Sequence, residues 1–441
     1  MVNLVIARSC TNTCPYCFEV SEREKGKQNL ISAENAVKVA EWARRANLAA
    51  LSFLGGEPFL HPELGKMVRL FRKASPNTNL RVLTGGVFNK DLLETLSPHD
   101  VGLVFNVNEP RDYQNPKHFN KVIRNIELAI SRGFNVVLGF NVWRLDFDTG
   151  FMPGLAARLA RTKFCWTVAN PIKDHRSNVV SREEYARLAD RCFEMLRIAS
   201  GYGLEAMLDC PVPPCFFKDS QLGWIAQYHP KTVANLGVCN PIMDITPELE
   251  VIRCFALSGM PRIKLVDFNN EREIREWFVK NVDDRLLQGG CFDECASCVH
   301  FSAGRCYGGC LAWHSQVGDA GAKPLALQLI ENMAQALENE NPELAIEYYS
   351  KATNWIKTDI AKYSAAVAAS ELGHWRRVLA FATEADQMTA NREMKEELRK
   401  LLADLPSEVF DQSVSGDPRM LSYVNCPQPS TVGTTPAPPA C

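Results

Sequence analysis

The stretch "SCTNTCPYCF", residues 9–18, carries Cys10, Cys14 and Cys17 at a CxxxCxxC spacing. Structural zinc sites take four protein ligands, and iron–sulfur clusters that only transfer electrons are normally held by four cysteines. Three thiolates therefore indicate a cluster that keeps one iron open. An open coordination position is where a metal centre performs chemistry.

The composition places this motif in an ordinary globular chain. Its 441 residues exceed one typical domain, so two or three domains are expected. A net charge of −2 predicts no nucleic-acid partner. The chain begins with no basic segment followed by an apolar core, and it has no apolar run that could cross a bilayer. We therefore expect a cytoplasmic protein without membrane contact, whose 16 cysteines serve metal binding or catalysis rather than disulfides.

Short apolar runs alternate with amphipathic segments up to about residue 200. The runs are continuous and bounded by Gly, Asn or Pro, as buried parallel strands should be. They cover residues 3–9, 48–56, 80–86, 101–108, 136–142 and 165–171. Helical patterns lie between them, such as residues 32–46, with Ser32 as the N-cap, and residues 120–133, closed by Gly133. This alternation predicts an α/β fold with a parallel sheet, open or curved into a barrel, and an active site at the C-terminal ends of the strands.

The cysteine loop follows the first of these strands, and "FLGGEPFLHPEL", residues 53–64, ends the second. Consecutive glycines at such a strand end let the backbone approach a ligand closely. Asparagines end the fourth and fifth strands, where they serve either as turn formers or as contacts to a cofactor or substrate. They are Asn106, Asn108 and Asn141.

A CxxxCxxC in the first loop followed by GGEP at the second strand resembles the radical S-adenosylmethionine superfamily. The resemblance implies a partial (β/α)6 barrel in which Cys10, Cys14 and Cys17 hold a 4Fe–4S cluster, with S-adenosylmethionine on the open iron. It implies that Tyr16 packs by the adenine and that the GGEP segment contacts the amino acid end of the cofactor. The residues of that segment are Gly55, Gly56, Glu57 and Pro58. Without the resemblance, the cysteines could be an incomplete zinc knuckle and GGEP a turn.

A second group of cysteines lies beyond residue 205. "CNPIMDITPELEVIRC", residues 239–254, predicts two short strands joined by a turn at Pro247. "CFDECASCVHFSAGRCYGGC", residues 291–310, holds five more cysteines, four of which form a CxxC and a CxxxC pair. Zinc ribbons also use CxxC pairs. The residues alone leave zinc and iron–sulfur as alternatives.

These stretches are similar to the SPASM extension of peptide-modifying radical enzymes, which binds auxiliary 4Fe–4S clusters. They depart from it at Leu249, where that family has glycine, in the longer gap before Cys306, and in lacking a final cysteine. The resemblance implies a small cysteine-rich α+β domain with two clusters, although one cluster or a zinc site remains an alternative. One ligand set is Cys291, Cys295, Cys298 and Cys306, and the other is Cys239, Cys254, Cys310 and, as the fourth ligand, Cys215. Cys165 and Cys192 are expected to be buried apolar residues.

From about residue 323 the pattern is helical, and segments ending at Ala352 and Ala385 are offset by 33 residues, which resembles tetratricopeptide repeats. Tyr348, Tyr349 and Trp375 are expected in the helix interfaces. We therefore expect a barrel at residues 1–204, a cluster domain at 205–322, a helical region at 323–408, and a disordered tail at 409–441 that contains Cys426 and Cys441.

The resemblance implies reductive cleavage of S-adenosylmethionine to a 5′-deoxyadenosyl radical, with an electron donor such as a flavodoxin or ferredoxin. Auxiliary clusters plus a partner-binding helical region favour oxidative modification of a peptide or protein, for example crosslink formation. One alternative is a radical enzyme that acts on a small metabolite. Another is a non-enzymatic iron–sulfur or zinc scaffold, against which the GGEP segment argues.

Overall fold

Strand β1 (Val2–Ala7) lies inside the central sheet, and all of its side chains are buried. The computed structural model describes residues 2–19, 29–172, 179–288, 295, 298–302, 306–314, 333–352, 359–389 and 392–406. A strand buried on both faces needs apolar residues at consecutive positions, and "VNLVIA" supplies them except at Asn3. The Asn3 amide donates to the Asp244 carboxylate at 2.7 Å, so its buried side-chain nitrogen is paired.

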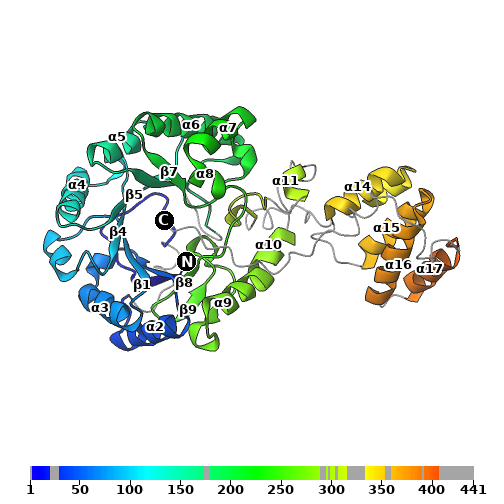
Figure 1. The fold of residues 1–441 in the computed structure, drawn as a ribbon, viewed down its shortest axis with the longest axis horizontal. Helices are drawn as coiled ribbons and strands as arrows, with labels where there is room; N and C mark the ends of the chain where they lie inside the picture. Colours follow the sequence, from blue (N-terminus) through cyan, green and yellow to red (C-terminus); the bar gives the residue numbers. More distant parts are fainter. Residues whose placement is uncertain are drawn as a thin grey trace. The chain divides into compact units, whose positions relative to one another are not determined.

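Seven strands pair in parallel in chain order, each with the next. After β1 they are β2 (Ala50–Gly55), β3 (Asn79–Thr84), β4 (Gly102–Asn106), β5 (Val136–Val142), β6 (Lys163–Val168) and β7 (Glu205–Leu208). Helices lie outside these strands (Figure 1). The six predicted strands and the partial barrel are confirmed, and β7 extends the sheet by one strand that the prediction lacked.

The other edge of the sheet is built from the second cysteine-containing region. Strand β8 (Met243–Ile245) pairs in parallel with β1, and β9 (Glu250–Ile252) returns antiparallel to it, followed by β10 (Ile263–Lys264). Arg8 binds Glu248 in the hairpin turn through two bonds of 2.8 and 3.0 Å. The expected boundary between residues 204 and 205 therefore falls within one continuous sheet.

Leu249 closes the predicted hairpin with a φ of 65°. A side chain in this left-handed region is strained, which explains why glycine suits the position. The Leu249 side chain is buried, and its backbone accepts a bond from Leu265 N at 3.0 Å. Burial of this side chain therefore offsets the backbone strain.

The outer helices begin and end largely where the sequence indicates. They are α2 (Ala33–Arg45), α3 (Leu64–Ala74), α4 (Pro116–Ser131), α5 (Phe151–Arg158), α6 (Tyr185–Gly201), α7 (Asp219–Tyr228) and α8 (Pro230–Ala234). Ser32 caps α2 by accepting a bond from Asn35 N at 3.1 Å. Gly133 follows α4 with a φ of 83°. Beyond the hairpin come α9 (Glu271–Phe278), a π-helical turn η8 (Val279–Asp283) and α10 (Asp284–Gln288).

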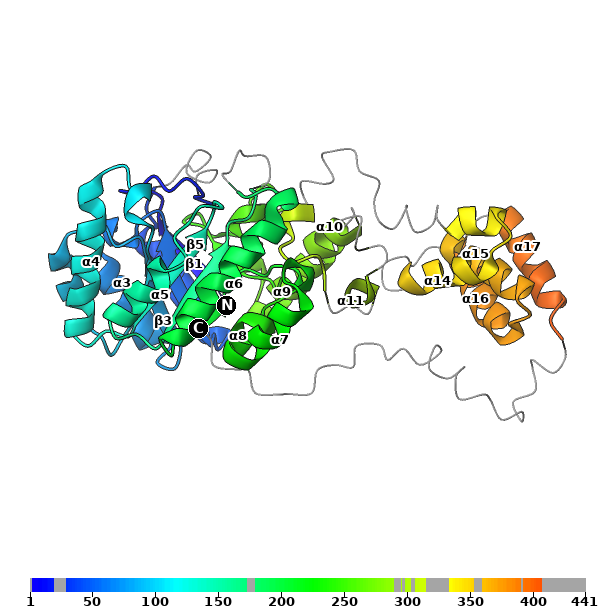
Figure 2. The same cartoon turned by 90° about the horizontal axis from the view of Figure 1, so that it is seen from above.

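The chain divides into two compact units. The first contains Met1–Cys295 and Arg305–Ala322, and the second contains Ala296–Gly304 and Lys323–Cys441. In the second unit, successive helices pack on one another (Figure 2). They are α14 (Pro342–Ala352), α15 (Asp359–Glu371), α16 (Trp375–Met388) and α17 (Arg392–Ala403), with the short α11 (Val299–Ser302) earlier in the chain.

Alanines form much of the core of the second unit, including Ala366, Ala369, Ala382 and Ala385. Small side chains let helices approach closely. Tyr349 is buried with its ring 4.7 Å from that of Phe381, so it lies in a helix interface as predicted. The resemblance to tetratricopeptide repeats stays a prediction, and the side chain of Trp375 lies outside the described residues. Among the helices that the structure describes, none combines the length and apolar character that a membrane span requires.

Candidate functional site

The first cysteine loop leaves the sheet directly after β1. Cys10, Cys14 and Cys17 are each half-buried, and the loop is tightened by a bond from Cys17 N to Cys14 O of 3.1 Å. The pKa of the Cys10 thiol is raised to about 12, mainly by burial and also by the charges of Glu57, Cys14 and Cys17. The three thiols therefore share one electrostatic environment.

This donor set fits an iron–sulfur cluster. Thiolates are the ligands that such clusters use, and a thiol with a raised pKa must release its proton when the metal binds. Within the described ranges, no three histidine, cysteine or acidic side chains converge as they do around a single metal ion. A four-iron cluster has its own larger geometry, because its thiolates bind different iron atoms.

The predicted glycines of GGEP position the cysteine loop. Gly56 N donates to Ala7 O and Glu57 N donates to Ser9 O, both at 2.8 Å. A Cβ on Gly56 would lie 2.3 Å from Ser9 O, and one on Gly55 would lie 2.1 Å from Ala7 O. The two glycines thus lie directly against the backbone that leads into Cys10, where a side chain would not fit. Their contact with a cofactor, like that of Pro58, stays a prediction.

Gly56→Ala should therefore destabilise the fold by roughly 3 kcal/mol or more, because only backbone atoms could move away from the new methyl group. Urea unfolding of the cluster-free protein would measure this change, and iron binding should weaken with it. Gly154→Ala is the matched control, since nothing lies within 4 Å of the added methyl in α5. If Gly56→Ala were as stable as the control, the role assigned to Gly56 would be wrong.

Glu57 turns its side chain inward and is fully buried. Its carboxylate accepts bonds from the Thr84 hydroxyl at 2.7 Å, Gly85 N at 3.0 Å and Phe59 N at 3.2 Å. Burial raises the pKa of Glu57 to about 7, although these three bonds act in the opposite direction. Glu57 thus joins the ends of β2 and β3 beside the cysteine loop.

The raised pKa of Glu57 predicts a pH dependence of stability. Between pH 4.5 and about 7 the folded protein retains a proton that the unfolded chain has released, so stability falls as pH rises through this window. The slope from this group is at most about 1.4 kcal/mol per pH unit. Urea unfolding at several pH values should show it in the wild type and in Glu41→Gln, which changes an exposed residue of α2, but not in Glu57→Gln. An equal slope in all three proteins would contradict this prediction.

Tyr16 and three asparagines form one hydrogen-bonded network at the rim of the sheet. Tyr16 is buried, and its hydroxyl donates to the Asn108 side chain and accepts from Asn106 at 3.3 Å. Asn141 donates to Asn106 at 2.7 Å, while Asn108 donates to the Cys14 sulfur at 3.4 Å. The structure brings these predicted residues together and connects them to a cluster ligand. Their contacts with a cofactor stay predictions.

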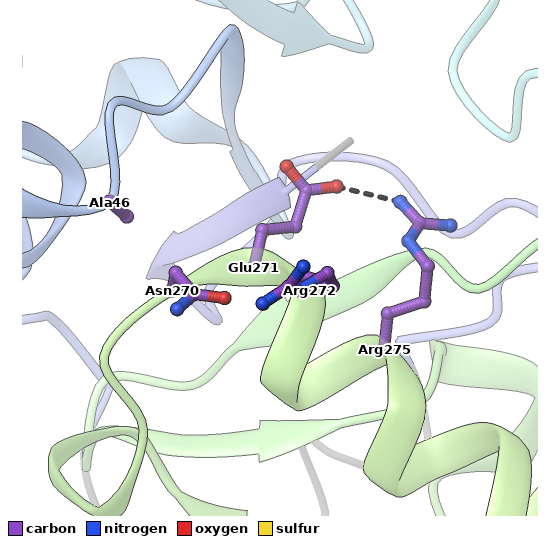
Figure 3. Close-up of a pocket in the computed structure, with 5 residues that line it drawn as sticks. All are labelled: Ala46, Asn270, Glu271, Arg272 and Arg275. Atoms are coloured by element: carbon purple, nitrogen blue, oxygen red, sulfur yellow. Dashed lines mark hydrogen bonds and ion pairs between the residues drawn. The ribbon is translucent and has the colours of Figure 1, made fainter. Parts of the chain in front are cut away.

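A small pocket of about 80 Å³ opens beside this network. Cys14, Asn108 and Tyr113 line it, together with polar residues of the cysteine loop and of the segment that follows β4. A larger pocket of about 400 Å³ lies at the start of α9 (Figure 3). There Glu271 and Arg275 form an ion pair of 2.6 Å, and the residues that line the pocket include no thiol. The smaller pocket is therefore the one associated with the cysteine loop.

Three segments of the second cysteine-containing region are tied together next to the end of β7. Gly237 N donates to Val212 O at 2.9 Å, and Gly237 O accepts from Tyr307 N at 2.8 Å. Gly309, with a φ of 85°, packs so closely that a Cβ would lie 2.8 Å from Pro213. The Tyr185 ring contacts the rings of Phe216 and Trp313, with distances between ring centroids of 5.2 and 5.7 Å. The "DCPVPPCFF" loop is thereby fixed against the Cys306–Cys310 loop.

Four cysteines gather where these segments meet. Cys239 and Cys310 share a thiol hydrogen bond, which lowers the pKa of Cys239 and raises that of Cys310. Burial raises the pKa of Cys210, and the charges of Asp209, Cys239 and Cys254 raise it further. Cys210 therefore lies close enough to Cys239 and Cys254 for their charges to act on it, whereas the sequence predicted Cys215 as the fourth ligand of this group.

Cys215 lies nearer to the other predicted group. The pKa of Cys306 is raised to about 11, mainly by burial and also by the charges of Cys295 and Cys215. Cys298 belongs to the second compact unit, and Cys291, Cys426 and Cys441 lie outside the described residues. Cys192 is fully buried in α6, as expected, and Cys165 is half-buried in β6. The sequence signal for Cys210 was its position directly after a strand, but that strand was not predicted.

Comparison with known proteins supports the same reading of the fold. Residues 4–144 match the family described as the Radical SAM superfamily. The chain is similar to the solved structure of native anSMEcpe with bound AdoMet, at 15% identity and a TM-score of 0.55, covering 80% of this chain and 98% of that one. With AdoMet and the Cp18Cys peptide bound, anSMEcpe matches at 15% identity and a TM-score of 0.54, covering 84% and 99%. Streptococcus suis SuiB bound to S-adenosylmethionine matches at 12% identity and 0.48, covering 68% and 70%.

Proposed function

Because this chain carries a radical S-adenosylmethionine domain and is an enzyme that binds a 4Fe–4S cluster and S-adenosylmethionine, we propose that it oxidatively modifies a peptide or protein. The observation that carries this proposal is the position of the two cysteine regions. The first loop follows β1, and Cys210 follows β7, which is parallel to β1 in the same sheet. The first loop and Cys210 therefore both lie beyond the C-terminal ends of parallel strands, where barrel enzymes bind substrates.

In the proposed assignment, Cys10, Cys14 and Cys17 hold the cluster that binds S-adenosylmethionine. Cys210, Cys239, Cys254 and Cys310 hold one auxiliary cluster, while Cys215, Cys295 and Cys306 belong to a second. When bound, the cofactor supplies hydrogen-atom abstraction, which no side chain can perform.

The chain's own residues orient and shield this chemistry. Asn108 holds the Cys14 sulfur and the Tyr16 hydroxyl together, and Glu57 closes the ends of β2 and β3. Net oxidation removes two hydrogens from the substrate. After one hydrogen atom has been abstracted, one electron and one proton must still leave the substrate radical. A cluster on the auxiliary thiols would supply an electron acceptor, which a simple scaffold would not need. A peptide substrate is further supported by the fold likeness to anSMEcpe, which was crystallised with a peptide.

The test separates the possible substrates by size. The reduced, iron-loaded protein is incubated with S-adenosylmethionine and with either a peptide fraction or a metabolite fraction of a cell extract. We expect the peptide fraction to increase 5′-deoxyadenosine formation and to yield a product lighter by two hydrogens. If only the metabolite fraction increased 5′-deoxyadenosine formation, the substrate would be a small molecule and not a peptide. Zinc without iron in the purified protein would favour the scaffold. Cytoplasmic location and a flavodoxin or ferredoxin donor remain predictions.

A further inference from the structure

Arg253 is one of the largest fully buried side chains, although it carries a permanent charge. It follows β9 and precedes Cys254. Its Nε and Nη2 donate to the two carboxylate oxygens of Asp283 at 2.9 and 3.0 Å. Removing two charges from water costs several kcal/mol per ion, so a buried pair of this kind is weak evidence for stability. Its contacts therefore suggest another role.

The same guanidinium also contacts a cysteine of the auxiliary group. Arg253 Nη2 donates to Cys239 O at 3.1 Å and to the Cys239 sulfur at 3.5 Å. The positive charge of Arg253 is therefore directed at a sulfur that we assign to a cluster.

Asp283 is presented by an uncommon backbone element. It ends η8 (Val279–Asp283), the π-helical turn between α9 and α10. Single π-helical turns are rare and occur frequently at functional sites. This turn places the carboxylate on the Arg253 fork, where both side chains are excluded from solvent. The charge next to Cys239 is thereby fixed in orientation and partly compensated.

We propose that Arg253 is a positioning residue that raises the reduction potential of the auxiliary cluster on Cys210, Cys239, Cys254 and Cys310, and that Asp283 limits this effect. The inference rests on the proposed function, because it needs that cluster. A reduced cluster carries one more negative charge, so a hydrogen bond to its thiolate and a nearby cation stabilise the reduced form. In a buried site this interaction is poorly screened. The cluster then accepts an electron from the oxidised substrate more readily.

The Arg253–Asp283 pair allows an experiment in which two variants should shift the reduction potential of the cluster in opposite directions. Asp283→Asn keeps an oxygen for Arg253 but removes the negative charge, so the cluster should become easier to reduce. The double variant Arg253→Met with Asp283→Leu removes both charges without leaving one unpaired. In this variant the cluster should become harder to reduce. At a fixed ambient potential we expect the ratio of reduced to oxidised cluster to change by roughly tenfold in each direction, the size of one hydrogen bond to a charged group.

The measurement is a potentiometric titration followed by electron paramagnetic resonance on the full-length, iron-loaded chain with Cys10, Cys14 and Cys17 replaced by alanine. Arg262→Gln is the control, because it removes a half-exposed pair with Glu250 in the same hairpin. It should leave the ratio unchanged. Arg253→Lys, which keeps the charge but loses the forked contact, should give a ratio between those of the wild type and the double variant. It replaces the double variant in the test if the double variant does not bind iron.

The outcomes distinguish this inference from the proposed function. Variants that load iron but show the wild-type ratio, or that both shift in the same direction, would overturn the role of Arg253 and leave the cluster in place. A wild-type chain that binds no iron beyond the first cluster would overturn the proposed auxiliary site itself. Opposite shifts with unchanged iron content would support Arg253 as the residue that sets the potential.

Discussion

Replacing Cys10, Cys14 and Cys17 together by alanine should abolish cleavage of S-adenosylmethionine and lower the iron content from about twelve to about eight atoms per chain. The three thiols share one environment after β1 and are the proposed ligands of the cluster that binds the cofactor. Without them no iron is left to bind S-adenosylmethionine, whereas the auxiliary thiols are unchanged. The expected loss of 5′-deoxyadenosine formation is therefore complete.

This measurement needs anaerobic purification, reconstitution, and counts of iron and sulfide before S-adenosylmethionine and dithionite are added. Cys165→Ala is the control, because it changes a thiol in β6 that is assigned to no cluster. It should retain the iron content and the activity. Cofactor cleavage by the triple variant, or a fully loaded wild type that does not cleave the cofactor, would contradict the proposed site.

The second large effect concerns Cys210 and Cys215. Each single alanine variant should lower the iron content from about twelve toward eight, because a cluster that loses one of its thiolates becomes labile. Since the structure places Cys210 with Cys239 and Cys254, and Cys215 with Cys306, the double variant should fall toward four. Independent sites give additive losses. Cleavage of S-adenosylmethionine should persist in all three variants.

If both cysteines served one cluster, the double variant would keep about eight irons, as each single variant does. That result would restore the grouping in which Cys215 completes the set with Cys239. Cys192→Ala is a further control, because its fully buried thiol in α6 lies in the helix layer. It should keep all of the iron.

The strands were predictable where burial on both faces requires a continuous apolar run. This holds for β1 and β2, for example. It fails for β7, whose "EAML" is too short to be distinguished from the end of a helix. It also fails for the pairing of β8 with β1, since a contact across 241 residues leaves no local pattern. The hairpin itself was found, because Pro247 separates two short apolar runs.

The site was predictable in its first loop and less so in the second region. A spacing such as CxxxCxxC specifies neighbouring thiols within one loop, whichever way the rest of the chain folds. Cys210 and Cys215 flank the same "PVPP" segment, and the contacts that fix this segment come from Gly309 and Gly237, which are distant in the sequence. The inward turn of Glu57 was equally unreadable, because its partners Thr84 and Gly85 lie on another strand.

The pairing of β1 with β8 has a consequence for biosynthesis. The strand that leads into the first cysteine loop is made first, yet its neighbour on one side is made only once residue 245 has been added. Contacts between distant segments form late, and domains made at the ribosome fold as units. The Arg8–Glu248 pair next to Cys10 likewise waits for the hairpin. Iron should therefore enter the first loop only after more than half of the chain has been made, and loading of chains ended before and after β9 would measure this order.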